Sequence, residues 1–375
     1  MKTQKTILCA TLVLLFVLAG PVSAAYYNVI DLGTLPGGGN SNAESINGNG
    51  SQIVGNAYDS SGNLHSCLFD SPNRDLGSLG YNESVTCYSV NNNCQIVGGA
   101  HLAYGFTSRA CLFDPTGGGA NINLGILPGY QQSNAYSINN KGQIVGLSTN
   151  YGPGWASYSH ACIFYATGGS PTDLGALGSN VPYSEAMSIN DQGQIVGWAG
   201  HGTDRIACLF DATGAGNNID LGGLGGNYSL AYSNNDGQIV GVATNSSGYS
   251  RACIFDPTGG GANIALETVV GFDNAGAWFI NNHAQIVGSA WNSSGNSHAW
   301  LFNPMTGDMM DLNTLIDPAS NWVLTNATCI SNNGWIVGDG INPDGETHAF
   351  LLTPEPATVV MMGLGGLALL RKRRA

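Results

Sequence analysis

The sequence predicts an all-β protein, a seven-bladed β-propeller closed by its N-terminal strand, and three observations lead to this prediction. The word Gln-Ile-Val-Gly, or a close variant, occurs seven times, with starts 43 to 51 residues apart. A second word, Cys-Leu-Phe or a variant of it, also occurs once in each repeat. No repeat shows a helical period, and Gly or Asn interrupts the junctions between apolar runs, as is typical of repeated four-stranded blades. The first words begin at Gln52, Gln95, Gln143, Gln194, Gln238, Gln285 and Trp335.

The third repeat illustrates the strands expected in each blade. Residues 135–139 and 143–146 form two strand-like runs around the turn residues Asn140-Lys141-Gly142. Residues 160–164 form a third run, and a short fourth run ends in Asp-Leu-Gly at Gly175. The runs contain consecutive apolar residues, which indicates a sheet buried on both faces. A glycine at the last position of the second hairpin favours a type I turn followed by a left-handed residue.

The two ends of the repeat array predict how the ring closes. A fourth-strand word stands alone at residues 26–32, and the last repeat stops after its third strand at residues 347–352. We expect these two segments to pair, which would remove an open sheet edge. An open solenoid is the alternative architecture.

The N-terminal segment, residues 1–24, has the order of a secretory signal peptide. Lys2 and Lys5 precede an apolar run, and Val22-Ser23-Ala24 offers small residues for cleavage. We therefore expect an N-terminal signal helix that is removed on export, followed by the repeat body at residues 25–353.

The C-terminal segment, residues 354–375, begins with Pro354-Glu355-Pro356, continues with the apolar run 357–370 and ends in a basic cluster. The cluster consists of Arg371, Lys372, Arg373 and Arg374. This order resembles the PEP-CTERM sorting tail of Gram-negative secreted proteins, and the resemblance implies recognition by an exosortase-type processing enzyme. As a single apolar helix the run would span about 21 Å, less than a bilayer core of about 30 Å. A transient inner-membrane anchor is expected, and a permanent single-pass tail is the alternative.

The charge of the repeat body excludes some classes of partner. Five basic residues stand against 23 acids between residues 25 and 353. Nucleic-acid binding needs clustered Lys and Arg, so we expect none, and we expect membrane contact only through the tail. The localisation indicated is the cell surface or the extracellular space.

The third-strand words give a second resemblance. Three of them read His-Ala followed by Cys, Trp or Phe, at His160, His298 and His348. With Asp-Leu-Gly and Gln-Ile-Val-Gly, this pattern resembles the HAF family of probable extracellular repeats over essentially the whole body. The resemblance implies a secreted repeat protein and no particular reaction. Because Arg109 and Arg251 replace the histidine in two repeats, we predict hydrogen-bonding histidines and no metal site or cofactor.

The repeated cysteines predict buried, unpaired thiols. Five of them occupy one equivalent position, where the last two repeats have Trp300 and Phe350. A position that exchanges Cys with an aromatic residue is typical of an apolar core, where Cys behaves as a small hydrophobe.

Unrepeated acids and aromatic loops provide two functional hypotheses. We expect loops between second and third strands to present aromatic rings to sugars, with Tyr104, Tyr151, Trp155, Trp198 and Trp291 as candidate binding residues. Packing within each hairpin is the alternative for these rings. We therefore predict a binding or scaffolding module of the exopolysaccharide matrix rather than an enzyme. The alternative is a glycoside hydrolase or lyase that uses Glu44 and Glu185 near the channel.

Overall fold

The computed structural model describes residues 27–80, 85–102, 108–151, 157–178, 183–201 and 204–355. These residues form 28 strands and two single-turn 3₁₀ helices, so the all-β prediction is confirmed. In the described ranges no helix is both long and apolar enough to cross a membrane. The predicted signal helix at 1–24 and the predicted apolar helix at 357–370 lie outside the described residues.

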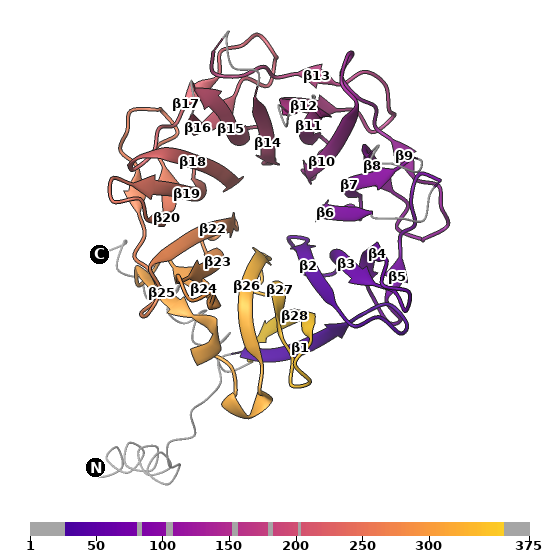
Figure 1. Cartoon of the computed structure of the whole chain (residues 1–375), viewed down its shortest axis with the longest axis vertical. Helices are drawn as coiled ribbons and strands as arrows, with labels where there is room; N and C mark the ends of the chain where they lie inside the picture. Colours follow the sequence, from indigo (N-terminus) through magenta and orange to yellow (C-terminus); the bar gives the residue numbers. More distant parts are fainter. Residues whose placement is uncertain are drawn as a thin grey trace, which may run out of the picture.

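The strands form seven antiparallel units of four, and Figure 1 shows these units arranged around a common centre. The first unit holds β2 (Ser41–Ile46), β3 (Ile53–Tyr58), β4 (Leu64–Phe69) and β5 (Arg74–Asp75). The second holds β6 (Thr86–Val90), β7 (Ile96–His101), β8 (Ser108–Phe113) and β9 (Ile122–Asn123). The third holds β10 (Gln132–Ile138), β11 (Ile144–Tyr151), β12 (Ser157–Phe164) and β13 (Thr172–Asp173).

The remaining units follow the same order. The fourth holds β14 (Ser184–Ile189), β15 (Ile195–His201), β16 (Asp204–Phe210) and β17 (Ile219–Asp220). The fifth holds β18 (Gly225–Asn234), β19 (Ile239–Asn245), β20 (Ser250–Phe255) and β21 (Ile264–Ala265), and one parallel bridge joins it to the fourth. The sixth holds β22 (Asn274–Ile280), β23 (Ile286–Trp291), β24 (Ser297–Asn303) and β25 (Asp308–Asp311). The helices η1 (Leu312–Thr314) and η2 (Pro318–Ser320) lead to β26 (Val323–Ile330), β27 (Ile336–Ile341) and β28 (Thr347–Pro354).

The seventh unit contains both ends of the described chain. β1 (Tyr27–Gly33) pairs antiparallel with β28, from Tyr27 opposite Pro354 to Gly33 opposite Ala349. The predicted pairing of the first strand with the last is therefore confirmed, and Figure 1 shows β1 at the outer edge of this unit.

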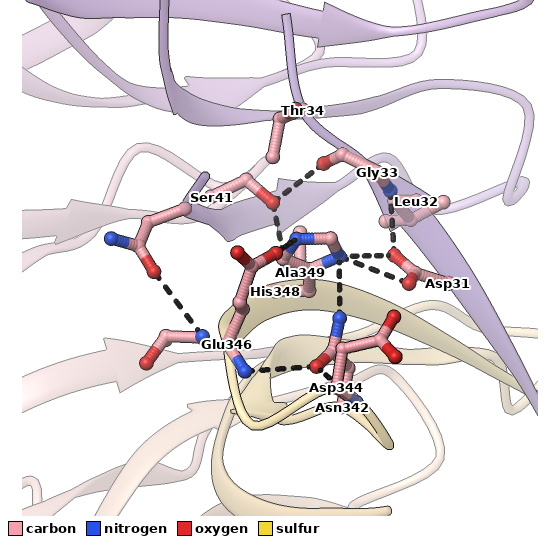
Figure 2. A network of polar contacts seen from close by, with 12 residues as sticks. Asp31, Leu32, Gly33, Thr34, Ser41, Asn342, Asp344, Glu346, His348 and Ala349 are labelled. Carbon is pink, nitrogen blue, oxygen red and sulfur yellow. Dashed lines mark hydrogen bonds and ion pairs between the residues drawn. The ribbon is translucent and has the colours of Figure 1, made fainter. Parts of the chain in front are cut away.

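A polar network joins the seventh unit to the first (Figure 2). Ser41 Oγ donates to the carbonyl oxygen of Gly33 at 2.6 Å and accepts from the backbone N–H of Ala349 at 2.9 Å. His348 Nδ1 lies 2.9 Å from the carboxylate of Asp31. Ser184 makes the equivalent contacts between the third and fourth units, to Gly175 and Ala161. The junction between the ends of the chain thus uses the same hydrogen bonds as an internal junction.

The hydrophobic core lies between neighbouring units rather than within one. One cluster, for example, combines Ala43, Ile46 and Phe69 of the first unit with Val337 and Leu351 of the seventh. Each sheet is therefore buried on both faces, as the consecutive apolar residues predicted. The predicted left-handed hairpin glycines are also confirmed, with φ between 78° and 85° at Gly62, Gly248, Gly295 and Gly345.

Candidate functional site

A β-bulge at the same position of each innermost strand builds the candidate site. In the first unit Ala43 pairs with Gly55 and Ser45 pairs with Val54, so Glu44 is the extra, unpaired residue. The same register shift occurs in the other six units. A bulge re-aims the side chain that it leaves unpaired. The seven bulge residues are Glu44, Tyr88, Tyr136, Met187, Tyr232, Trp278 and Thr328.

The glycine of each Gln-Ile-Val-Gly word is required by this bulge. It lies opposite the bulge, where the backbone of the innermost strand approaches closely. A Cβ atom at Gly146, for example, would collide with the carbonyl oxygen of Asn134. The glutamine of the same word stabilises the turn between the first and second strands. In the third unit, Gln143 Oε1 accepts a hydrogen bond of 2.7 Å from Asn139 Nδ2 across this turn.

All seven bulge side chains line one cavity of about 730 Å³ among the innermost strands. Each of them is partly buried. Because each comes from a different unit, the cavity belongs to the whole arrangement and not to one repeat. Hydroxyl groups accompany the bulge residues, and the lining contains Ser45, Ser89, Ser137, Ser188, Ser289, Ser297, Thr325 and Thr328.

The aromatic rings of the cavity hold one another in place. The Trp278 ring meets the Tyr232 ring edge to face at a centroid distance of 5.0 Å, and it stacks on Trp291 at 6.3 Å. Its indole N–H donates to Ser289 Oγ at 3.0 Å. Tyr88 and Tyr136 make a second edge-to-face pair at 5.1 Å. Such preferred ring geometries fix a rigid, amphipathic wall.

Two carboxylates enter the cavity from opposite ends of the chain, Glu44 on β2 and Asp339 on β27. Burial and the negative charge of Asp339 raise the pKa of Glu44 to about 7, against hydrogen bonding by Asn42 that lowers it. Burial also raises the pKa of Asp339, although Asn326 and Thr325 donate hydrogen bonds to its carboxylate. Burial, with the nearby charge of Glu44, raises the pKa of Tyr88 to about 12, so this phenol stays neutral.

At the other end of the innermost strands, asparagine side chains join neighbouring units by hydrogen bonds. Asn91 Nδ2 donates to the carbonyl oxygen of Asn139 at 2.9 Å, and Asn139 donates in turn to Asn190 at 2.9 Å. The same link repeats from Asn190, Asn235 and Asn281 to the next unit. A smaller space of about 330 Å³ lies at this end. Because these amides are already hydrogen-bonded to protein, we place the candidate site at the end of the bulge residues.

Only one of the two predicted carboxylates lines the cavity. Glu44 is a bulge residue, whereas Glu185 lies two positions before the bulge at Met187 and pairs with Trp198. Burial raises the pKa of Glu185, and a hydrogen bond from the Trp198 indole and the positive charge of Arg205 oppose part of this rise. The carboxylate that accompanies Glu44 in the cavity is therefore Asp339, because the register of the strands gives Glu44 and Glu185 different positions.

Of the five predicted aromatic residues, the structure describes the side chains of Trp198 and Trp291. Tyr104 and Trp155 lie outside the described residues, and of Tyr151 only the backbone is described, at the end of β11. Trp198 is only 6% exposed, packed with Leu230 and Val242, so the expected exposed ring is absent there. Trp291 is partly buried and supports the cavity through its stack on Trp278.

The repeated histidines pair with the repeated aspartates of Asp-Leu-Gly. His65, His160 and His298 lie 2.9, 2.8 and 2.7 Å from Asp75, Asp173 and Asp311. The predicted hydrogen-bonding role is confirmed for these residues. Across the ranges that the structure describes, no group of three or more His, Cys, Asp or Glu side chains could hold a metal ion. The five repeated cysteines are buried and unpaired, as predicted.

The bulge positions were not identified from the sequence, although a signal is present. Most innermost strands read Ala-X-Ser-Ile-Asn or a close variant, and X is the position that changes most within this word. A variable residue at a fixed place in a repeat often marks a shared surface. Asp339 carries a similar signal, since it directly follows Trp335-Ile336-Val337-Gly338, at a position that varies from repeat to repeat.

Comparison with known proteins identifies a sorting motif in the C-terminal tail and shows a similarity of fold for the repeat body. The PEP-CTERM protein-sorting motif matches residues 352–374, which confirms the sorting motif predicted from Pro354, Glu355, Pro356 and the basic cluster. This motif implies exosortase-dependent export to the cell surface. No curated protein matches the sequence.

Several solved structures resemble the fold. A puromycin-hydrolyzing peptidase of Mycobacterium tuberculosis has a TM-score of 0.55 and 12% identity, covering 90% of this chain and 53% of its own. A puromycin hydrolase has a TM-score of 0.50 and 11% identity, and the match covers 82% of this chain and 50% of the hydrolase. TolB of Acinetobacter baumannii has a TM-score of 0.44 and 10% identity, and the match covers 80% of this chain and 63% of TolB. The chain spans about half the length of the two hydrolases. At these identities the likeness concerns a propeller-like fold alone.

Proposed function

We propose that this protein is a closed seven-bladed β-propeller of the HAF-repeat type, which binds polysaccharide of the extracellular matrix in its axial cavity. An exosortase-type enzyme would process its tail after export from a Gram-negative cell, with the tail as a transient inner-membrane anchor. The protein would then act as a binding or scaffolding module.

Several contacts support closure of the ring. β1 completes the unit of β26, β27 and β28. Thr328 Oγ1 on β26 donates to the carbonyl oxygen of Ala43 on β2 at 2.8 Å, a second contact between these units beside those of Ser41. An open solenoid would leave the outward faces of the first and seventh units exposed, whereas here they share a buried apolar cluster.

The observation that carries the binding function is the composition of the axial cavity. Its wall combines the rings of Tyr88, Tyr136, Tyr232 and Trp278 with at least eight serine or threonine side chains. Sugar rings offer apolar C–H faces and many hydroxyl groups, and a wall of aromatic faces and neutral polar groups complements both. A cavity of about 730 Å³ is also within the size range of ligand sites.

The surface around the loops between second and third strands is a second contact region in this proposal. Tyr58, Tyr158 and Tyr249 are exposed at these loops, and Tyr158 stacks on Tyr183 at 5.9 Å. Tyr104, Tyr151 and Trp155 belong to the same loops by sequence. A polymer longer than the cavity would reach rings at this rim.

The second candidate function is a carbohydrate-active enzyme, and the observation that favours it is the pair Glu44 and Asp339 in one cavity. Glycoside hydrolysis uses two carboxyl groups, one of them with a raised pKa as the acid. The pKa of about 7 at Glu44 suits that role. Glu185 would not take part, because it contacts Trp198 instead.

A glycan array probed with the exported protein tests the binding function. We expect retention of one class of polysaccharide by the wild type and loss of about tenfold or more in affinity for Trp278→Ala, as expected when a buried aromatic contact is removed. Tyr165→Ala is the matched control, since Tyr165 is exposed beyond β12 and does not line the cavity. Equal binding by both variants would contradict the axial site.

Chromatography of the bound polysaccharides separates the two candidate functions. A binding module leaves the polymer intact in both the wild type and Glu44→Gln. An enzyme releases shorter products in the wild type and none in Glu44→Gln, while Glu185→Gln keeps its activity.

A further inference from the structure

We propose that the axial cavity selects a positively charged ligand, namely a polysaccharide of amino sugars whose amines are free and protonated. This inference rests on the proposed polysaccharide binding and names the class of sugar. Three features of the cavity lead to it: the sign of its charges, the way its carboxylates are held, and its aromatic faces.

The first feature is the sign of the charge. Glu44 and Asp339 are the only charged side chains in the described lining, which contains no Lys, Arg or His. The body around the cavity is also strongly acidic, with five basic residues against 23 acids. A low-dielectric cleft lined by charges of one sign concentrates ligands of the opposite sign. An acidic polysaccharide would be repelled from this site.

The second feature is that neutral donors alone hold the two carboxylates. Glu44 Oε1 accepts hydrogen bonds from the amides of Asn42 and Asn56. Asp339 accepts from Thr325 Oγ1 at 3.3 Å and from Asn326 Nδ2 at 3.2 Å. Neither carboxylate has an ion pair with a cation among the described residues. Two partly buried carboxylates held in this way leave negative charge that a bound ammonium group would balance.

A further acceptor lies beside Asp339. The Asn326 Oδ1 atom is buried and has no hydrogen-bond partner within the described ranges. An ammonium group carries three N–H donors, so the two carboxylates and this amide oxygen together match its hydrogen-bonding capacity.

The third feature is the set of aromatic faces around the same space. Trp278 and Tyr232 come from neighbouring units and make an edge-to-face pair. Tyr88 follows Glu44 around the cavity wall, close enough for the charge of Glu44 to raise the pKa of its phenol. A cation over an aromatic face is attracted by the ring quadrupole, most strongly when it is desolvated. The wall therefore favours both the apolar face of the sugar and its charged amine.

The fourth unit shows the same combination with the cation supplied by the chain itself. Arg205 lies over the Trp198 ring at 4.7 Å and acts on the neighbouring carboxylate of Glu185. By strand register, Trp198 and Asp339 occupy equivalent positions, each one residue after the glycine opposite the bulge. In the cavity the aromatic and acidic groups are present, and a ligand would bring the cation.

Isothermal titration of the exported protein with two oligosaccharides of equal length tests the proposal. One probe is an N-acetylated glucosamine oligomer and the other is its fully de-N-acetylated form. The titrations are made at about pH 7, where Glu44, with a pKa of about 7, is partly ionised and an ordinary alkyl amine is protonated. We expect the de-N-acetylated probe to bind at least about tenfold more tightly, the effect of one good charge-assisted contact.

Variants identify the source of the preference. Glu44→Gln and Asp339→Asn should each reduce the preference for the de-N-acetylated probe to about threefold or less, because each keeps the shape and removes one charge. Asp308→Asn is the matched control, since Asp308 is exposed on β25 outside the cavity. It should keep the full preference.

The possible results separate this inference from the proposed function. Equal binding of the two probes would overturn the selection of a cation and leave polysaccharide binding in place. A preference that survives in both cavity variants, or that is lost in Asp308→Asn, would place the charge effect elsewhere and overturn the inference too. Failure of both probes to bind, while a neutral polysaccharide binds on the array, overturns the inference alone. Failure of every glycan to bind overturns both the inference and the proposed function.

Discussion

Glu44 and Asp339 lie 295 positions apart in the sequence and line the same cavity, where burial and the charge of Asp339 raise the pKa of Glu44. Glu44 is the bulge residue of β2, and Asp339 lies on β27 after the glycine opposite the bulge of β26. The contact between the first and seventh units therefore places two acidic side chains in one cavity.

This pair should make stability depend on pH. The folded-state pKa of Glu44 is about 7 against a reference value of 4.5. The folded state therefore binds more protons than the unfolded state in this window, and stability falls as pH rises from about 4.5 to about 7. Asp339 on β27 and the neutral Cys87 and Tyr88 on β6 are the titratable groups that face Glu44.

Glu44→Gln should accordingly stabilise the protein at about pH 8 by about 1 to 3 kcal/mol, with little effect at about pH 4. Urea titrations at the two pH values measure the difference. Asp308→Asn should show no such change with pH. An effect of Glu44→Gln that is equal at both values would contradict the buried pair.

Gly146→Ala should destabilise the third unit by about 3 kcal/mol or more, because the added Cβ would collide with the carbonyl oxygen of Asn134 at the bulge. Gly178→Ala is the matched control, since a Cβ there meets no atom within 4 Å. We expect the control to change the free energy of unfolding by less than about 1 kcal/mol. Similar losses in the two variants would mean that the bulge does not need its glycine.

Ser41→Ala and Ser184→Ala test whether the ends of the chain are joined as firmly as its internal units. Each serine is buried and makes the same two hydrogen bonds to the preceding unit. Each substitution should cost about 1 to 3 kcal/mol, because it leaves a buried N–H and a buried carbonyl without a partner. If Ser41→Ala costs nothing while Ser184→Ala does, the ring is open at this junction in solution.

Phe113→Ala should cost about 3 to 5 kcal/mol, because Phe113 is 2% exposed and packs in the core between the first and second units. Ile122→Ala on β9 serves as the comparison, since Ile122 is 40% exposed, and should cost less than about 1 kcal/mol. Guanidinium titration measures both. A cost near that of the control would show that Phe113 is not in a core.

Deletion of residues 356–375 tests the sorting tail without disturbing the fold. Pro354 still pairs with Tyr27 in this truncation, so the free energy of unfolding should change by less than about 1 kcal/mol. Membrane retention and processing should be lost, as measured by fractionation and the mass of the exported chain. Unaltered localisation would contradict the sorting role.

Much of the fold could be predicted from single repeats. The four strands of the third repeat, the glycines of the second hairpins and the pairing of β1 with β28 all follow from local patterns and from the incomplete repeats at each end. The site could not be predicted in the same way. Glu44 and Glu185 look alike as acids near the starts of innermost strands, yet a bulge directs one into the cavity and the register sets the other beside Trp198.

The sequence alone determined the repeat, its strands and turns, the buried thiols and the sorting motif, because each depends on residues close together in the chain. The tertiary structure decided which side chains share the axial cavity. Seven bulges had to be brought around one centre before Glu44, Trp278 and Asp339 could line one space. Side-chain direction at a bulge and charge interaction across a junction are properties of packed strands, and no single repeat contains them.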